Sequence, residues 1–202
     1  MADALYIRSR NSDEPPADPY LRAPLTLDIV NARDLPDRLE PVRHRLIIIP
    51  MQSDEIMLSR KSAWLEAAWR GGAAILANDI VALPYLPFLR PFEPIPLPGL
   101  GDFSVAPYSP HPAFDGLPFD RFHLLSGMAG VYGVGHNPPP PGAVVVNTIG
   151  RGAYAIDWYL DNEAGGLFFC HGGPDISAFH SGPEHTPNLT HELIRWMMEL
   201  KR

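Results

Sequence analysis

Leu46-Ile47-Ile48-Ile49 opens the stretch of sequence that decides the fold. Four apolar residues without alternation are typical of a strand that is buried on both faces of a parallel sheet. Residues 57–69 then place apolar side chains at helical spacing, and Gly71-Gly72 ends the helix, because glycine tolerates the left-handed conformation there. A second buried strand follows at 73–77. The unit therefore predicts two parallel strands joined by a right-handed helical crossover.

Further apolar runs extend this unit in both directions. They predict two weaker strands upstream and three strands downstream, at 5–7, 27–30, 121–125, 143–146 and 167–170. A closing helix is expected to begin at Thr186-Pro187, a cap residue followed by a proline at the first helical position. The pattern predicts the α/β class: a flavodoxin-like three-layer domain with a mostly parallel sheet, formed by residues 1–202 as a single domain.

The segment 84–118 interrupts this pattern with ten prolines. Proline cannot donate to a sheet ladder and breaks helices, so neither a central strand nor a long helix is expected here. The segment also carries several aromatic side chains, namely Tyr85, Phe88, Phe92, Phe103 and Tyr108. We interpret it as a proline-rich loop or lid that packs onto its own domain, with a wall for stacking sugars or a contact surface of a homodimer as the alternatives.

Composition excludes several classes of function. The 202 residues carry 16 Lys and Arg against 23 Asp and Glu, a net charge of −7, and no basic run. We therefore expect neither nucleic acid nor an anionic membrane as a partner. No apolar run is long enough to cross a bilayer, and we expect no signal peptide. The single cysteine, Cys170, allows no intrachain disulfide, so a cytoplasmic protein is expected.

Polar residues follow the predicted strands, where an open α/β sheet binds its ligands. Because parallel strands end at the same edge of the sheet, we expect these side chains to gather there. The candidates are Gln52, Ser53, Asn78, Asp79, Ser126, Thr148, Arg151 and His171. Arg151 stands between two glycines, where backbone amides and its guanidinium could bind an anion together.

Three segments carry a resemblance to a known family. Gly166-Leu-Phe-Phe-Cys-His171-Gly-Gly-Pro-Asp175 resembles the strand that delivers the catalytic histidine and acidic residue in class I glutamine amidotransferases. His111-Pro-Ala-Phe-Asp-Gly-Leu-Pro118 is similar to a segment of the trehalose-utilisation (ThuA-like) branch of that superfamily. The closing residues 187–196 resemble the terminal helix of that branch. The resemblance covers about residues 44–200 and implies catalytic positions for His171 and Asp175.

The sequence departs from that family at the nucleophile. An amidotransferase needs a cysteine on the turn after a sheet strand, but the corresponding place here is Leu76-Ala77-Asn78-Asp79. Cys170 and His171 are neighbours in one strand, so their side chains point to opposite faces. We therefore expect a pseudoenzyme with respect to glutamine hydrolysis.

Three functions remain open. The first is the binding of a small polar ligand, such as a carbohydrate, through Gln52, Ser53, Asn78 and Arg151. The second is a hydrolase or isomerase that uses His171 with Asp79 or Asp175 as acid and base. The third is a structural role in a homo-oligomer, with the proline-rich segment as the interface.

No cofactor or metal is expected. Four histidines lie between positions 171 and 191, with Asp175 and Glu184 among them, but their spacing matches no compact metal motif. The glycines at 130–135 and 150–152 lack the strand-then-helix context of a dinucleotide-binding loop.

Overall fold

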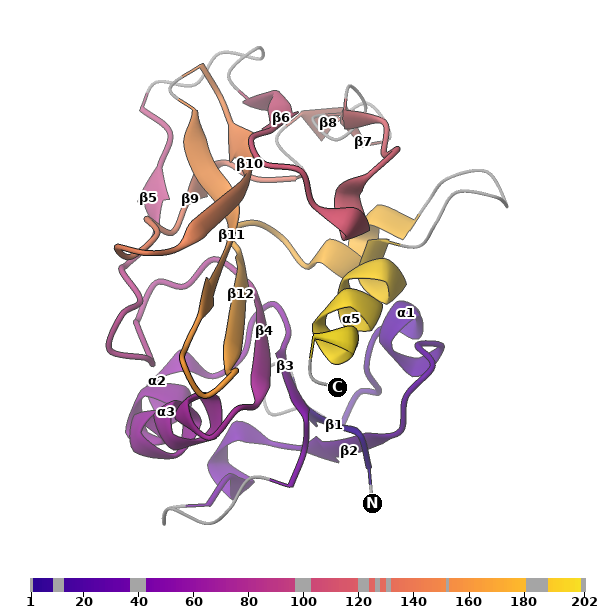
Figure 1. The fold of residues 1–202 in the computed structure, drawn as a ribbon, viewed down its shortest axis with the longest axis vertical. Helices are drawn as coiled ribbons and strands as arrows, with labels where there is room; N and C mark the ends of the chain where they lie inside the picture. Colours follow the sequence, from indigo (N-terminus) through magenta and orange to yellow (C-terminus); the bar gives the residue numbers. More distant parts are fainter. Residues whose placement is uncertain are drawn as a thin grey trace.

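The computed structural model describes residues 2–8, 13–36, 43–96, 103–119, 124–125, 128–129, 132–151, 153–180 and 189–200. Within these residues one sheet of eight strands has the order β2-β1-β3-β4-β12-β11-β10-β6 (Figure 1). Its strands are β1 (Ala4–Ile7), β2 (Leu27–Val30), β3 (Leu46–Ile49), β4 (Ala74–Asn78), β6 (Val105–Pro107), β10 (Val144–Ile149), β11 (Tyr154–Asp161) and β12 (Leu167–His171).

The sheet is parallel from β2 to β12 and antiparallel beyond it. β1 pairs with β2 and β3, β4 pairs with β3 and β12, and all these pairs are parallel. β11, β10 and β6 continue the sheet in antiparallel pairs. The mostly parallel α/β sheet is thus confirmed. β11 was not predicted, because Asp157 interrupts its apolar pattern in the middle of the strand.

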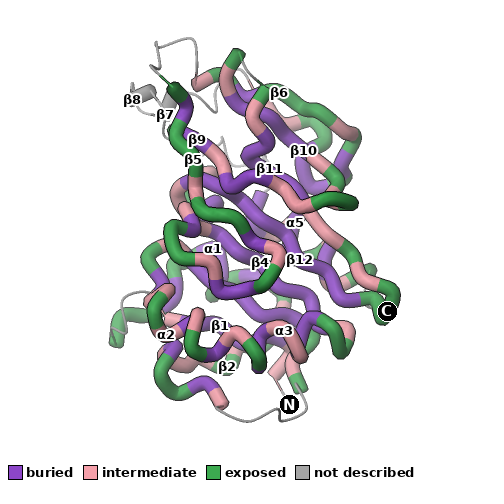
Figure 2. Tube along the Cα trace, turned by 90° about the vertical axis from the view of Figure 1, so that its left-hand side faces the viewer, coloured by how far each residue is buried: buried purple, intermediate pink, exposed green. Residues whose placement is uncertain are grey.

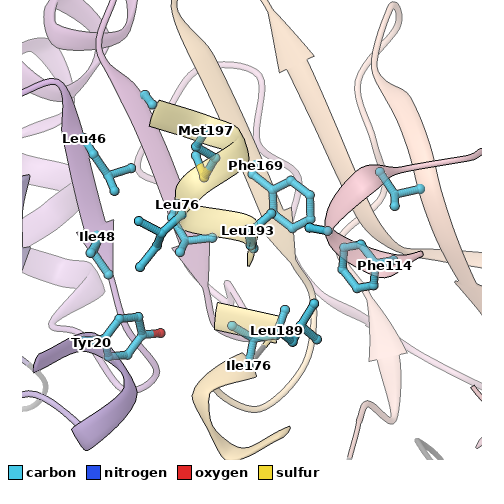
Figure 3. Close-up of a cluster of buried hydrophobic side chains, with 14 of the residues drawn as sticks. Tyr20, Leu46, Ile48, Leu76, Phe114, Phe169, Ile176, Leu189, Leu193 and Met197 are labelled. Carbon is cyan, nitrogen blue, oxygen red and sulfur yellow. The ribbon is translucent and has the colours of Figure 1, made fainter. Parts of the chain in front are cut away.

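Alternate residues of the central strands face two different helical layers. In β3, Ile47 and Ile49 belong to a core with α2 (Glu55–Arg60) and α3 (Ser62–Arg70). Leu46 and Ile48 belong to the opposite core, with α1 (Asp18–Leu21) and α5 (Leu189–Glu199) (Figures 1 and 3). A tube coloured by burial shows the sheet strands as the buried centre of the molecule (Figure 2). The strand period of two produces this three-layer arrangement.

The helix expected over 57–69 is divided at Lys61. The backbone of Lys61 leaves the helical region between α2 and α3, at φ −94° and ψ 9°. Its buried ammonium group donates a 2.6 Å hydrogen bond to the carbonyl oxygen of Leu35. A buried cation needs such an acceptor, so the contact holds α2 and α3 to the loop after β2.

The proline-rich segment 84–118 contains no central strand within its described residues. β6 lies at the edge of the large sheet, and β5 (Glu93–Pro94) pairs with β9 (Gly135–His136) in a separate ladder. A 3-10 turn, η4 (Pro112–Phe114), follows β6. Tyr85 packs into the core beside α3, whereas Tyr108 is exposed.

Short elements complete the described chain. They are the hairpin strands β7 (Leu124–Leu125) and β8 (Met128–Ala129), and the 3-10 turns η2 (Ala32–Asp34) and η5 (Ile176–His180). The rest of the strand expected at 121–125, and the Thr186-Pro187 start of the last helix, lie outside the described residues. None of the helices described has the length and apolar character that a membrane span requires.

Candidate functional site

A row of four buried polar side chains crosses the sheet at the C-terminal end of its parallel strands. Asn78 of β4 is paired in register with His171 of β12, which is paired with Asp157 of β11, which is paired with Asn147 of β10. All four residues are fully buried. Residues paired across neighbouring strands lie on the same face of a sheet, so the side chains form one continuous row.

His171 uses both of its ring nitrogens inside the protein. Nδ1 lies 2.6 Å from Oδ1 of Asp157, and Nε2 lies 2.9 Å from the carbonyl oxygen of Pro174. A carbonyl oxygen can only accept, so Nε2 carries a proton and donates it to Pro174. A second proton lies between Nδ1 and the carboxyl group of Asp157. Neither nitrogen is left with a lone pair that could accept a proton from water.

Asp157 is surrounded by hydrogen-bonding side chains. Its Oδ2 accepts hydrogen bonds of 2.7 Å from the hydroxyl of Tyr132 and from Nδ2 of Asn147. Burial and the nearby Asp157 raise the pKa of Tyr132 well above its usual value, so its hydroxyl remains a donor. With two donors on Oδ2 and the histidine on Oδ1, both oxygens of this buried carboxyl group have hydrogen-bond partners.

The partner of His171 differs from our expectation. From the sequence we expected His171 to pair with Asp79 or Asp175, whereas the structure pairs it with Asp157. Asp157 was not a candidate because it lies inside an unpredicted strand. A charged residue in the otherwise largely apolar run 154–160 was the one sequence signal that could have indicated it.

Asp175 joins the loops that follow three parallel strands. Its Oδ1 accepts from Tyr20 Oη at 2.8 Å and from Asn78 Nδ2 at 2.9 Å. Its Oδ2 accepts from the backbone amide of Met51 at 3.2 Å. Oδ1 also accepts from the amide of Ser177, two residues on, which is an Asx turn. Asp175 therefore holds together the ends of β3, β4 and β12.

Asn78 ends β4, within the stretch 76–79 where we expected the nucleophile of the resembling family, and every polar atom of its side chain is hydrogen-bonded. Nδ2 donates to Asp175 and to the hydroxyl of Tyr20, and Oδ1 accepts from the amide of Ile176 at 2.9 Å. Both donors and the acceptor of the amide are thereby satisfied within the protein.

Asp79 and Gln52 provide the accessible polar groups at this edge. Asp79 is half-buried, and its carboxylate accepts 2.6 Å hydrogen bonds from the amides of Gln52 and Ile80. Gln52 is exposed and has a positive φ of 64°, which is uncommon for a residue other than glycine. Ser53 is buried and donates to the carbonyl of Pro50 at 2.8 Å.

Burial raises the pKa of Asp79 to about 7, and the nearby carboxylates of Glu55 and Asp175 add to the rise. Glu55 accepts from the amides of Ala82 and Leu83, and burial raises its pKa as well. Two half-buried carboxyl groups with raised pKa values thus lie beside the exposed Gln52. Such perturbed groups are typical of functional sites.

Arg151 lies apart from these residues. It is exposed in the turn between β10 and β11, whereas Asp157 is three residues beyond the first residue of β11. At about 3.3 Å per residue, that turn extends about 10 Å past the buried row. Thr148 is buried in β10, and Ser126 lies outside the described residues.

Gly173 allows the loop after β12 to close over His171. A Cβ atom on Gly173 would lie 2.0 Å from the carbonyl oxygen of Tyr132 and 2.9 Å from Nε2 of His171. A glycine is required because the loop approaches both neighbours so closely. The neighbouring Gly172 donates its amide to the carbonyl of Ile156 at 2.7 Å.

Cys170 faces the core opposite to that of the polar row. It is fully buried among the side chains that pack against α2 and α3. Burial, with the charges of Asp157 and Asp79, raises the pKa of its thiol well above the usual value. The structure therefore holds Cys170 as a neutral thiol, which is a poor nucleophile.

This burial predicts that Cys170 reacts slowly in the native protein. We expect a thiol reagent such as iodoacetamide to modify native protein at least about 100-fold more slowly than protein unfolded in urea, because modification requires opening of the core. Mass spectrometry over time measures both rates, with Cys170→Ala as the blank. Equal rates in the two conditions would show that the thiol is accessible.

The histidines near the C-terminus do not form a described metal site. His191 makes a 2.8 Å hydrogen bond with the carbonyl oxygen of Pro19. His171 is hydrogen-bonded to Asp157 and to the carbonyl oxygen of Pro174. The side chain of His180 and all of Glu184 and His185 lie outside the described residues. In the part of the chain that the structure describes, no three His, Cys, Asp or Glu side chains are grouped to hold a metal ion.

Comparison with known proteins supports the fold. No protein family and no curated protein sequence matches the chain significantly. Among solved structures, the chain is similar to a Thermoplasma acidophilum protein that is provisionally assigned as one of the subunits of GMP synthase. The TM-score is 0.58 with 13% sequence identity, over 100% of this chain and 94% of that one. At this identity the similarity shows the fold alone, which is an α/β fold with a mostly parallel central sheet.

Proposed function

We propose that this protein binds a small polar ligand at the C-terminal edge of its sheet and does not perform the thiol chemistry of glutamine amidotransferases. The observation that carries the proposal is the hydrogen bonding of the Asn78 side chain. In the stretch 76–79, where the resemblance would place a nucleophile, Asn78 carries an amide whose donors and acceptor all form hydrogen bonds within the protein. With Cys170 buried on the other face, no described thiol is available beside His171.

The edge offers groups that suit hydroxyl-bearing ligands. Asp79 titrates near neutral pH, so its carboxyl group can accept or donate a hydrogen bond under ordinary conditions. Gln52 is exposed next to it and can do both at all pH values. Sugars and other polyols present hydroxyl groups that donate and accept in the same way. We therefore propose a neutral polyol or carbohydrate as the ligand class.

The screen that tests this proposal uses thermal shifts of the full chain with neutral sugars, polyols and amino acids. A ligand of this edge should stabilise the parent protein and lose most of that effect with Gln52→Ala or Asp79→Asn. The matched control is Glu66→Gln, which changes a carboxylate on α3 that pairs with Arg70. A ligand that stabilises both edge variants as much as the parent would show that the binding site is not at this edge.

A second candidate function is acid–base catalysis by Asp79. Its pKa of about 7 suits a group that exchanges a proton at neutral pH. His171 supports this candidate less well, because both ring nitrogens are hydrogen-bonded within the fold. If the rate of the parent protein changes with pH near pH 7 and the rate of Asp79→Asn does not, Asp79 is the titrating group.

The raised pKa of Asp79 also predicts how stability depends on pH. An unfolded aspartate titrates near its usual value of 3.8, whereas folded Asp79 titrates near 7. Between these values the native state binds more protons, so this carboxyl group lowers the free energy of unfolding as the pH rises from about 4 to about 7. Above that range its contribution is constant.

Urea denaturation at several pH values measures this effect. The free energy of unfolding of Asp79→Asn should rise relative to that of the parent as the pH rises from about 4 to about 7. Glu66→Gln should show no comparable trend in that window, because Glu66 is a surface carboxylate in an ion pair. A constant difference for Asp79→Asn would show that the pKa of Asp79 is not raised.

A further inference from the structure

Two carboxyl groups at the C-terminal edge of the sheet each bind the backbone of a neighbouring loop. Asp79, in the loop after β4, accepts a 2.6 Å hydrogen bond from the amide of Gln52, in the loop after β3. Glu55, the first residue of α2, accepts from the amides of Ala82 and Leu83 at 3.0 and 2.7 Å. The bonds run in both directions, so the two carboxyl groups cross-link the loop after β3 to the loop after β4.

The loop after β4 has a further attachment that does not titrate. Nδ2 of Asn137 donates to the carbonyl oxygen of Val81 at 2.8 Å, and its Oδ1 accepts from the amide of Val81 at 3.2 Å. An amide side chain keeps its donor and its acceptor at all pH values. Gln52, in the loop after β3, is instead bound to the carboxyl group of Asp79. Protonation of the carboxyl groups should therefore affect the loop after β3 more than the loop after β4.

The surroundings of Asp79 and Glu55 favour their neutral forms. The titratable groups that face this pair from other segments are Asp175 after β12, Cys170 of β12 and Tyr85 after β4. Burial raises the pKa of Asp79 to about 7, and the charges of Glu55 and Asp175 add to the rise. Burial also raises the pKa of Glu55. Asp79 therefore binds a proton near neutral pH, and Glu55 binds one at a higher pH than an ordinary glutamate does.

Protonation weakens the hydrogen bonds between the two loops. A carboxylate accepts from a backbone amide more strongly than a neutral carboxyl group does. The bonds from the amides of Gln52 and Ile80 accordingly lower the pKa of Asp79, against the larger effect of burial. A bond that opposes protonation is weakened by protonation to the same extent, because the coupling is reciprocal. Gln52 also has a φ of 64°, a strained conformation that a weaker bond holds less firmly.

We propose that Asp79 and Glu55 form a pH-sensitive clasp, which fixes the loop after β3 in mildly alkaline solution and releases it in weakly acidic solution. Gln52 lies in this loop, so the clasp controls whether its side chain is presented at the edge of the sheet, a consequence that rests on the function proposed above. The release is local. Proton uptake by Asp79 stabilises the native state against unfolding, so a falling pH loosens the loop while it strengthens the fold as a whole.

Exchange of amide protons with water, measured by NMR on the full chain without any ligand, tests the clasp. Dividing the exchange rate of an unstructured peptide at the same pH by each measured rate gives a protection factor. From about pH 8 to about pH 5.5, we expect the protection factor of the Gln52 amide to fall about tenfold, and that of Val81 to change less than about twofold. An unchanged value at Gln52, or an equal fall at Val81, would overturn the proposal.

Three variants assign the effect to the clasp. Asp79→Asn keeps an acceptor that does not titrate, so the protection of Gln52 should be low at both pH values. Glu55→Gln should in the same way remove the pH dependence at the amide of Leu83, which gives a second measurement. The matched control Glu66→Gln should respond to pH like the parent. A fall at Gln52 in Asp79→Asn as large as in the parent would contradict the clasp. Because no ligand is used, this proposal and that of ligand binding can fail separately.

Discussion

Replacing Asp157 by Ala is expected to lower the free energy of unfolding by about 3–5 kcal/mol, the range found when one partner of a buried ion pair is removed. Asp157 accepts hydrogen bonds from His171, Tyr132 and Asn147, all of which are buried. Without this carboxyl group the three buried side chains lose their hydrogen-bond partner at once, which leaves polar groups unsatisfied in the core. Urea denaturation followed by circular dichroism measures the loss.

The matched control for this substitution is Asp161→Ala at the other end of β11. Asp161 is in the same strand but exposed, so its replacement should change stability by less than about 1 kcal/mol. His171→Ala in the parent should cost nearly as much as Asp157→Ala, and the double variant should cost less than the sum. Additive losses would show that His171 and Asp157 do not act as a pair.

Gly173→Ala is expected to be the second most damaging substitution, with a loss of about 3 kcal/mol, at the upper end of the usual cost of overpacking. The new methyl group would lie 2.0 Å from the carbonyl oxygen of Tyr132 and 2.9 Å from Nε2 of His171. Because the first of these contacts is with backbone, the loop after β12 must move away. That movement would break the hydrogen bond between His171 and Pro174.

Gly172→Ala provides the graded comparison for Gly173→Ala. Its added Cβ would meet the amide nitrogen of Asn137 at 3.0 Å and Cα of His136 at 3.3 Å, so neighbours need to shift by only a few tenths of an ångström. We expect a smaller loss than for Gly173→Ala, measured by thermal denaturation. Equal losses would mean that the close approach to Tyr132 does not determine the role of Gly173.

Much of the fold could be predicted because its strongest signals are local. The strands β3, β4 and β12 are buried on both faces, so apolar residues follow one another without interruption over 46–49, 74–77 and 167–170. The centre of β11 is buried too, but Asp157 interrupts its apolar run. Because charged residues are rare in a core, the sequence did not indicate a buried strand there. The break at Lys61 was also missed, and the hydrogen bond of Lys61 to the carbonyl group of Leu35, 26 positions earlier in the chain, leaves no local signal in the sequence.

The candidate site could be predicted only in part. Asn78, Asp79, His171 and Asp175 do lie at one edge, as parallel strands require. The hydrogen-bond partners of these side chains were not predictable, because Asp157 and Tyr132 reach the site from an antiparallel strand and a distant loop. β10 runs in the same direction as β12 and ends at the same edge, but its turn to β11 carries Arg151 about 10 Å past the buried row.

The sequence by itself determined the α/β class, the crossover at 46–77 and the absence of a cysteine from 76–79, since these depend on residue types and short-range periodicity. The tertiary structure alone decided which carboxylate meets His171 and which polar groups remain for a ligand. The physical reason is strand register. The regular β11–β12 pair places Asp157 beside His171, and the register shift of the β10–β11 pair at Asn147 adds Asn147 to the same row, which no local pattern encodes.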